Sequence, residues 1–306
     1  MFLFKHPYLL VIVLILLFVG CNKTAKKSQK PSCKALLATN FNSMDEFTAT
    51  VHLEYANKSN DSCSGTVQIQ YKNQGQTISS QLSDGVTQGD IVTAHKGSIW
   101  DKISLVLKAP YAIIKRKELS QIFMLARRRP AIFGKDDVAF YDLAQASMRN
   151  ILVNKNAFKS YRDSLEKGYI NTFNHITAQA LITAIYNEEI AHYIASVHER
   201  HHMPQLVSGK FTDFQLNDTI NFPVDNYVDI INNELGQELG KFLKYKYAIN
   251  QETRWTADFT CKFLNEVQDY YAQSFDIEIK PYQKNDSLIK RFSQKIETVK
   301  NNKSYL

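Results

Sequence analysis

The spacing of hydrophobic residues changes about one third of the way along the chain. From Phe47 to Tyr55 apolar side chains occupy every second position, which is typical of a strand with one buried face. Similar short segments, separated by turn-forming residues, follow at Val67–Tyr71, Ile78–Leu82, Asp90–His95 and Ile103–Lys108. Short strands at this spacing predict a small antiparallel β-sandwich over residues 41–114.

Beyond residue 136 the apolar positions recur with helical spacing. The segments expected to be helical are Asp137–Val153, Asn156–Lys167, Asn174–Tyr186, Glu188–His202, Asp225–Tyr245, Thr256–Phe275 and Asp286–Asn301. Residues 115–135 between the two halves carry two clusters of Lys and Arg, which we interpret as a basic linker with a solvated surface. The expected fold class is therefore α+β in two domains, with the β-sandwich followed by an all-α helical domain at residues 136–306.

The N-terminus has the pattern of an exported protein. A short head with Lys5 precedes twelve apolar residues, Tyr8–Val19, which are too few to span a bilayer as a helix. A charged head, an apolar middle and a small residue before the cleavage point predict a signal peptide at residues 1–20. Because Gly20 directly precedes Cys21, the segment resembles a bacterial lipoprotein signal, and the resemblance implies acylation of Cys21, palmitate included. The alternative is a soluble exported protein with a cysteine there by chance.

Residues 21–40 begin with a polar, basic stretch that has little to bury, so we expect a flexible tether. Among lipoproteins of this kind, Asn22 after the cysteine favours the outer membrane. The expected location is the cell envelope, with a lipid anchor in the outer membrane and the body facing the periplasm. The lipid bilayer is then the first partner, reached through the N-terminal acyl anchor.

The charge of the chain is concentrated at its N-terminus. There are 37 Lys and Arg against 30 Asp and Glu, but residues 1–34 hold six Lys and no acid, which leaves the rest at +1. A nearly neutral body argues against a nucleic-acid partner, because such proteins carry a strongly basic face. With 44% hydrophobic residues, the body has ample material for a packed core.

Three cysteines follow Cys21. Cys33 and Cys63 flank the first strand region, and export permits a disulfide between them. Cys261 lies in an apolar helical segment and is expected to be a buried thiol. The absence of a Cys-x-x-Cys pair gives no support to a thiol-redox motif or a cysteine zinc site.

Polar residues gather on one face of the helix expected after Asp225. At 100° per residue, Asp229, Asn232 and Asn233 share a stripe with two glycines beside the apolar face. Such side chains must be paired where helices pack, so one interpretation is a hydrogen-bond network between helices. His198 and Glu199 also begin the letters H-E-x-x-H of a zinc-protease helix, although Pro204 ends that helix at once.

These residues resemble a known arrangement. His175 near a helix start, His198-Glu199 further on and the series Asp229-x-x-Asn232-Asn233-x-x-Gly236 resemble an uncharacterised bacterial domain of exported lipoproteins and polymorphic toxins. The resemblance covers roughly residues 171–240 and implies a shared helical fold with these positions in one site.

Two functions are consistent with the sequence. The first is a lipoprotein that acts as a binding or accessory module for an envelope protein or a glycan. The second is an envelope hydrolase in which His175, His198 and Asp229 hold Zn²⁺ or another divalent metal and Glu199 is the general base. In both, we expect one pocket that brings together the six side chains of His175, His198, Glu199, Asp229, Asn232 and Asn233.

Overall fold

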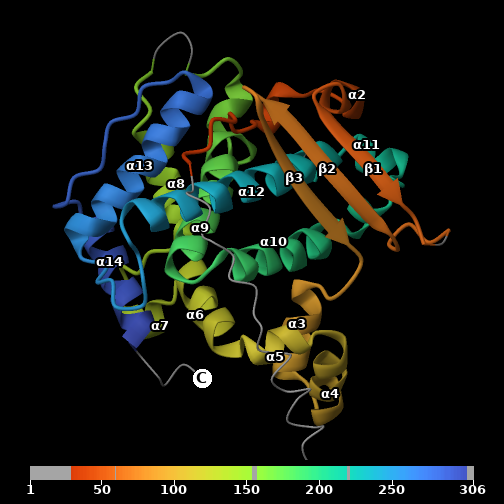
Figure 1. Cartoon of the computed structure of the whole chain (residues 1–306), viewed down its shortest axis with the longest axis horizontal. Coiled ribbons are helices and arrows are strands. Elements are labelled where there is room, and N and C mark those ends of the chain that lie inside the picture. The colour runs from red at the N-terminus through yellow and green to blue at the C-terminus, as the bar shows by residue number, and fades with distance from the viewer. Residues whose placement is uncertain (1–28, 59, 154–156, 219–220, 302–306) are drawn as a thin grey trace, which may run out of the picture.

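The computed structural model describes residues 29–58, 60–153, 157–218 and 221–301 (Figure 1). The predicted signal peptide, Cys21 and the first part of the tether lie outside the described residues. The end of the predicted tether is packed rather than flexible. Cys33 and Leu37 are buried in the core, and the short 3₁₀ helix η1 (Ala38–Asn40) follows them.

The sheet consists of β1 (Val51–Ala56), β2 (Thr66–Asn73) and β3 (Gln76–Ser83), which pair antiparallel in the order β1-β2-β3. Gln74 and Gly75 both have positive φ, as a two-residue hairpin between β2 and β3 requires. Alternate residues such as Val51, Ile69 and Leu82 are buried against the helices, whereas the other face of the sheet is exposed.

Within the described residues this three-stranded sheet replaces the expected β-sandwich. Phe47 belongs to α2 (Met44–Thr48), and the predicted strands at 90–95 and 103–108 lie in α3 (Gln88–Lys96) and α4 (Ile99–Lys108). The physical reason is local, because Thr87 with Asp90 and Ser98 with Asp101 form capping boxes that start both helices. Over a run of only six residues, the hydrophobic period of two that is typical of a strand cannot be distinguished from the period of 3.6 that is typical of a helix.

The helices account for most of the chain. The longer ones are α6 (Arg116–Ala126), α8 (Phe140–Arg149), α9 (Asn171–Ile185), α10 (Glu188–His202), α12 (Pro223–Lys246), α13 (Ala257–Phe275) and α14 (Ser287–Asn301). The shorter ones are α5 (Pro110–Ile114), α7 (Pro130–Phe133), η2 (Tyr161–Ser164), η3 (Glu166–Ile170), η4 (Pro204–Val207) and α11 (Asp213–Leu216). No helix of the described residues is long and apolar enough to cross a bilayer.

Two of the sequence expectations are wrong in this region. The predicted basic linker at 115–135 contains α6 and α7, and the helix expected at 156–167 is replaced by the short η2 and η3. The bounds of α10 agree with the prediction, because the side chain of Asn187 caps its start and Pro204 follows its end.

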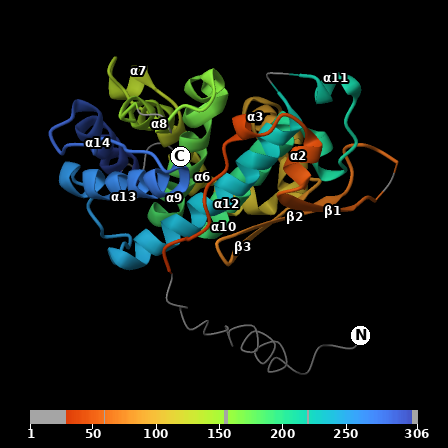
Figure 2. The same ribbon diagram turned by 90° about the horizontal axis from the view of Figure 1, so that it is seen from above.

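In the part of the chain that the structure describes, the strands and most of the helices contribute to one main hydrophobic core. Seen from above, α12 crosses the middle of the molecule between the strands and α13 (Figure 2). The backbones of α12 and α9 approach closely at Gly236 and Gly240, where an added Cβ would meet Ile176 and Ala180 of α9 at 2.8 and 2.6 Å. The central helix thus presents its polar residues directly to α9 and α10.

The expected disulfide does not form, because Cys33 and Cys63 are both free thiols. The Sγ of Cys33 lies 3.3 Å from the carbonyl oxygen of Asn73, at the end of β2, whereas Cys63 precedes the start of that strand. At about 3.3 Å per residue, the eight residues of β2 separate them by roughly 26 Å, and a disulfide needs Cα atoms within about 7 Å. Cys261 is buried, as expected.

Candidate functional site

Four of the six predicted site residues meet in one cluster between three helices. His175 of α9 contacts Asn233 of α12 through Nδ1 and Oδ1 at 2.9 Å, and its Nε2 lies 3.3 Å from Oδ2 of Asp229. The amide of Asn233 donates to Oε1 of Glu199 on α10 at 3.1 Å. Asp229 and Asn233 stand one helical turn apart, which is why both reach the same histidine. We call His175, Glu199, Asp229 and Asn233 the polar cluster.

Burial sets the protonation of the polar cluster. The side chain of Glu199 is 2% exposed, and its burial raises its pKa to about 8. Burial, with a contribution from the charge of Asp225, also raises the pKa of Asp229 well above its ordinary value. A neutral Asp229 then places an uncharged carboxyl beside Nε2 of His175. Asn233 joins the other two members, because its Oδ1 contacts Nδ1 of His175 and its amide donates to Glu199.

A second layer of side chains completes the network. The amide of Asn171 donates to both carboxylate oxygens of Asp229, at 2.8 and 3.1 Å, and Lys167 pairs with Asp225. Asn171, Lys167 and Asp225 were not among the residues expected at the site from the sequence. A signal was present, because Asn171 precedes His175 by four residues and Asp225 precedes Asp229 by four, so each pair shares a helix face.

His198 and Asn232 belong to other contacts. The Nδ1 of His198 contacts the side chain oxygen of Gln88 on α3 at 3.0 Å, and its ring centre lies 6.2 Å from that of His175. Burial and the neighbouring histidines lower the pKa of His198 to about 3, so it is neutral. Asn232 does not join the polar cluster, because its side chain hydrogen bonds to both the N–H and the carbonyl of Leu36.

The expected metal site is not present. In the part of the chain that the structure describes, no group of three His, Cys, Asp or Glu side chains is placed to hold an ion. His198 is turned toward Gln88, while Asn171 and His175 occupy the oxygens of Asp229. His175, His198 and Asp229 therefore do not form a ligand set for zinc.

The space beside the polar cluster is small. A pocket bordered by β3, α10 and α12 reaches Glu199 and Asn233, but its volume of about 10 Å³ holds one water molecule at most. The side chains of His175 and Asp229 are only 12% and 7% exposed. A substrate has no room to reach the polar cluster in this conformation.

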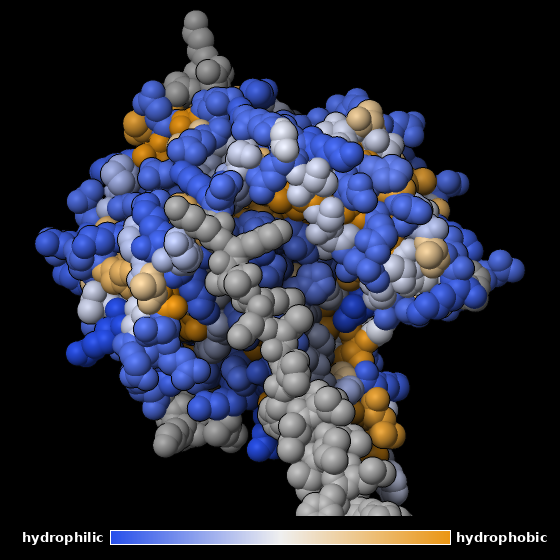
Figure 3. Space-filling model, in the orientation of Figure 1, coloured by the Kyte–Doolittle hydropathy of each residue, from blue (hydrophilic) through white to orange (hydrophobic). Residues whose placement is uncertain are grey.

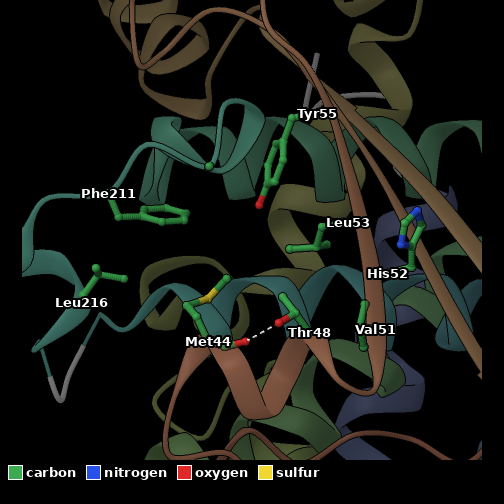
Figure 4. Close-up of a pocket in the computed structure, with 9 residues that line it drawn as sticks. Met44, Thr48, Val51, His52, Leu53, Tyr55, Phe211 and Leu216 are labelled. Atoms are coloured by element: carbon green, nitrogen blue, oxygen red, sulfur yellow. Dashed lines mark hydrogen bonds between the residues drawn. The ribbon is translucent and has the colours of Figure 1, made fainter.

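An open pocket lies elsewhere, between β1, α2 and the segment that leads to α11 (Figure 4). Its volume is about 410 Å³, within the range of small-molecule sites. Apolar side chains predominate in its lining, and Thr48 and His52 add polar groups. The lining residues are Met44, Thr48, Val51, His52, Leu53, Tyr55, Gly209, Phe211 and Leu216. We call this space the β1 pocket.

One side of the β1 pocket depends on a glycine. Gly209 has φ of +69°, and a Cβ added there would lie 2.6 Å from the ring of Tyr55. The hydroxyl of Tyr55 in turn lies 2.9 Å from that of Tyr227 on α12. The close approach therefore fixes the ring of Tyr55 between the pocket and the core. No sequence pattern pointed to this site, because its lining comes from two distant segments, 44–55 and 209–216, that share no motif.

Comparison with known protein families, with curated proteins and with solved structures finds no match to this chain.

Proposed function

We propose that this chain is a cell-envelope lipoprotein, anchored in the outer membrane through acylated Cys21, and that it acts as a binding module in the periplasm. The observation that carries the binding function is the β1 pocket, which is open to solvent and lined by apolar side chains. The polar cluster, by contrast, is buried and has its hydrogen bonds satisfied. This contrast favours binding over catalysis.

The lining of the β1 pocket indicates the chemistry of its ligand. Leu53, Phe211 and Met44 offer aliphatic, aromatic and thioether surface, while Thr48 and His52 are exposed polar residues. A ligand with a compact apolar body and one polar end matches this lining. Such a group can be an aromatic or aliphatic side chain of an envelope protein, or an apolar substituent on a glycan.

The experiment compares two phenylalanines seven and ten residues after Pro204. Binding of 1-anilinonaphthalene-8-sulfonate to the full chain is titrated by fluorescence for wild type, Phe211→Ala and Phe214→Ala. Phe211 lines the pocket, whereas Phe214 is 79% exposed and does not line it. We expect Phe211→Ala to raise the dissociation constant of the dye several-fold, because the dye binds more weakly, and Phe214→Ala to leave this constant unchanged. Equal effects of the two variants would show that the dye binds elsewhere and remove the support for the pocket.

The anchor has its own test. Growth with labelled palmitate should mark the wild-type chain and not Cys21→Ser, and the mature wild-type protein should begin at residue 21. A mature chain that begins at another residue would end the lipoprotein proposal without affecting the pocket.

The second candidate is the envelope hydrolase. The observation in its favour is that Glu199 and Asp229 both have raised pKa values next to His175, a combination that acid–base sites share. It requires an opening that admits substrate. Hydrolysis of p-nitrophenyl esters by wild type that disappears in His175→Ala, in a folded variant, would support it over the binding module.

A further inference from the structure

Helices α3, α4 and α5 form a unit that projects from one side of the body (Figure 1). Its attachment is a small apolar cluster made of Val86, Ala109 and Ala112, packed against Tyr193 of α10 and separate from the main core. Leu105 is the residue of α4 that packs against this cluster, and α4 has no buried residue at all. The rest of the helix faces away from the body.

The outward face of α4 is apolar. With Ile99 at 0° and 100° per residue, its exposed hydrophobic residues fall within an arc of about 120°, opposite Leu105. Trp100 is 74% exposed and Leu107 is 79% exposed. We call this set the α4 stripe: Ile99, Trp100, Ile103, Val106 and Leu107. Figure 3 shows apolar surface over this projecting part of the molecule. A contiguous stripe of this kind marks an interaction surface, unlike scattered single hydrophobics.

Positive charge surrounds the α4 stripe. Residues 88–118 contain six Lys and Arg and three Asp and Glu, a net charge of +3, so the remainder of residues 35–306 is at 1 − 3 = −2. Two of the three acids, Asp90 and Asp101, are held in helix capping boxes. Lys102 and Lys108 border the stripe on α4 itself and are exposed. Net positive charge therefore accompanies the outward apolar face of α4.

We propose that the α4 stripe inserts into the interface of an anionic bilayer, as a membrane contact in addition to the N-terminal anchor. A helix with an apolar face that includes Trp, bordered by lysines, has the chemistry of a helix that lies in the headgroup region. Each Lys or Arg near an anionic surface adds about 1 kcal/mol of attraction. A protein groove would not need the surrounding basic residues, and the anionic surface accounts for both features.

The N-terminal segment and the α3–α5 unit, which would make the two membrane contacts, join the body at opposite ends of β3. Ser32, near the N-terminal segment, hydrogen bonds to Gln76 at the start of β3, while α3 begins five residues after Ser83 at its end. A strand of eight residues is about 26 Å long. Two separated contacts would hold the body in one orientation on the membrane. This joint action rests on the proposed lipid anchor, whereas contact by the α4 stripe does not.

The chain carries its own probe for this contact. It has two tryptophans, of which Trp100 lies on the α4 stripe and Trp255 is 1% exposed in the core. The full chain is reconstituted into vesicles of phosphatidylcholine and phosphatidylglycerol whose acyl chains carry bromine, a short-range quencher of tryptophan. We expect wild-type emission to fall by about half and to shift to the blue, and Trp100→Phe to lose this response. Flotation of the same vesicles reports the N-terminal anchor separately.

Matched variants test the surface itself. Ile103→Lys with Leu107→Lys should reduce the quenching of Trp100 at least several-fold, whereas Phe214→Lys, an equally exposed site on α11, should not change it. Replacing phosphatidylglycerol with phosphatidylcholine should weaken the quenching. Three results would overturn the proposal: no quenching of Trp100 in chains that float with the vesicles, equal quenching without anionic lipid, or burial of Trp100 that follows protein concentration instead of lipid, as a second copy of the chain would produce.

Discussion

The Nε2 of His175 lies 3.3 Å from Oδ2 of Asp229, and both side chains are almost entirely shielded from solvent. Because burial raises the pKa of Asp229, an uncharged group with the same shape should replace it well. We expect Asp229→Asn to lower the free energy of unfolding by no more than about 1 kcal/mol, since its amide can donate to His175 and its oxygen can accept from Asn171.

Asp229→Ala is the contrasting variant. It removes the carboxyl beside Nε2 of His175 and leaves the amide of Asn171 with only Oδ1 of Asp225, at 3.3 Å, as an acceptor. A buried group left unsatisfied costs about 1–3 kcal/mol. Urea denaturation at pH 7 measures both variants. If Asp229→Asn destabilises the fold as much as Asp229→Ala, the carboxyl is ionised in the folded chain and its charge is required.

Glu199 and His198 give the protein opposite dependences on pH. The folded-state pKa of Glu199 is about 8 against an ordinary 4.5, so the folded state holds a proton that the unfolded state releases. Stability therefore falls as pH rises from about 4.5 to about 8. The pKa of His198 is about 3 against 6.5, so the unfolded state binds the extra proton and stability rises from pH 3 to pH 6.5.

Single substitutions should separate these two dependences. Glu199→Gln should reduce the loss of stability between pH 6.5 and 8, and His198→Gln should reduce the gain below pH 4.5. Denaturation midpoints measured across pH 3.5–8.5 show this directly. A wild-type profile that is flat from pH 6.5 to 8 would mean that Glu199 is ionised in the folded state.

Gly209→Ala tests the wall of the β1 pocket. The added Cβ would meet the ring of Tyr55 at 2.6 Å, and the positive φ of Gly209 adds backbone strain. We expect a loss of about 2–4 kcal/mol in unfolding free energy, because overpacking and strain each cost about 1–3 kcal/mol. Gly75→Ala is the matched control, since Gly75 has φ of +78° with nothing within 4 Å. It should show the strain alone, and similar losses in both variants would contradict the Tyr55 contact.

Asn232 is predicted to hold the N-terminal segment on the body. Its side chain makes two hydrogen bonds to the backbone of Leu36, and Leu36 is also an acceptor for Thr172. Asn232→Ala should increase cleavage by trypsin at Lys34 at least several-fold under native conditions. Asn265→Ala, which removes amide contacts elsewhere in the fold, should leave the rate at Lys34 unchanged. A rate at Lys34 that is the same in wild type and Asn232→Ala would contradict this role.

The accuracy of the sequence predictions follows the range of the interactions involved. The bounds of α10 were predictable because Asn187 and Pro204 act on adjacent residues. Asp229 and Asn233 were placed correctly on one face of α12, because helical periodicity orders the side chains within a single helix. The direction of Asn232 was not predictable, because its partner Leu36 is 196 residues away in sequence.

The β-sandwich was predicted wrongly for a related reason. The alternation in residues 90–95 and 103–108 suits a strand as well as a helix over so few residues, and the capping boxes at Thr87 and Ser98 decide between them. The β1 pocket has no local pattern at all, since Leu53 and Phe211 become neighbours only through the packing of the whole fold.

With Cys21 as the proposed lipid-bearing residue, the packing of the N-terminal segment would limit how far the body can stand from a membrane. Ser32 is hydrogen bonded to Gln76 and Cys33 is buried in the core, so only ten residues, 22–31, are left between the anchor and the body. A chain of that length, even when fully extended, reaches no more than about 40 Å. A partner of the β1 pocket would therefore have to come close to the bilayer surface. The protein would sample a thin layer beside its membrane and would not reach across a wide compartment.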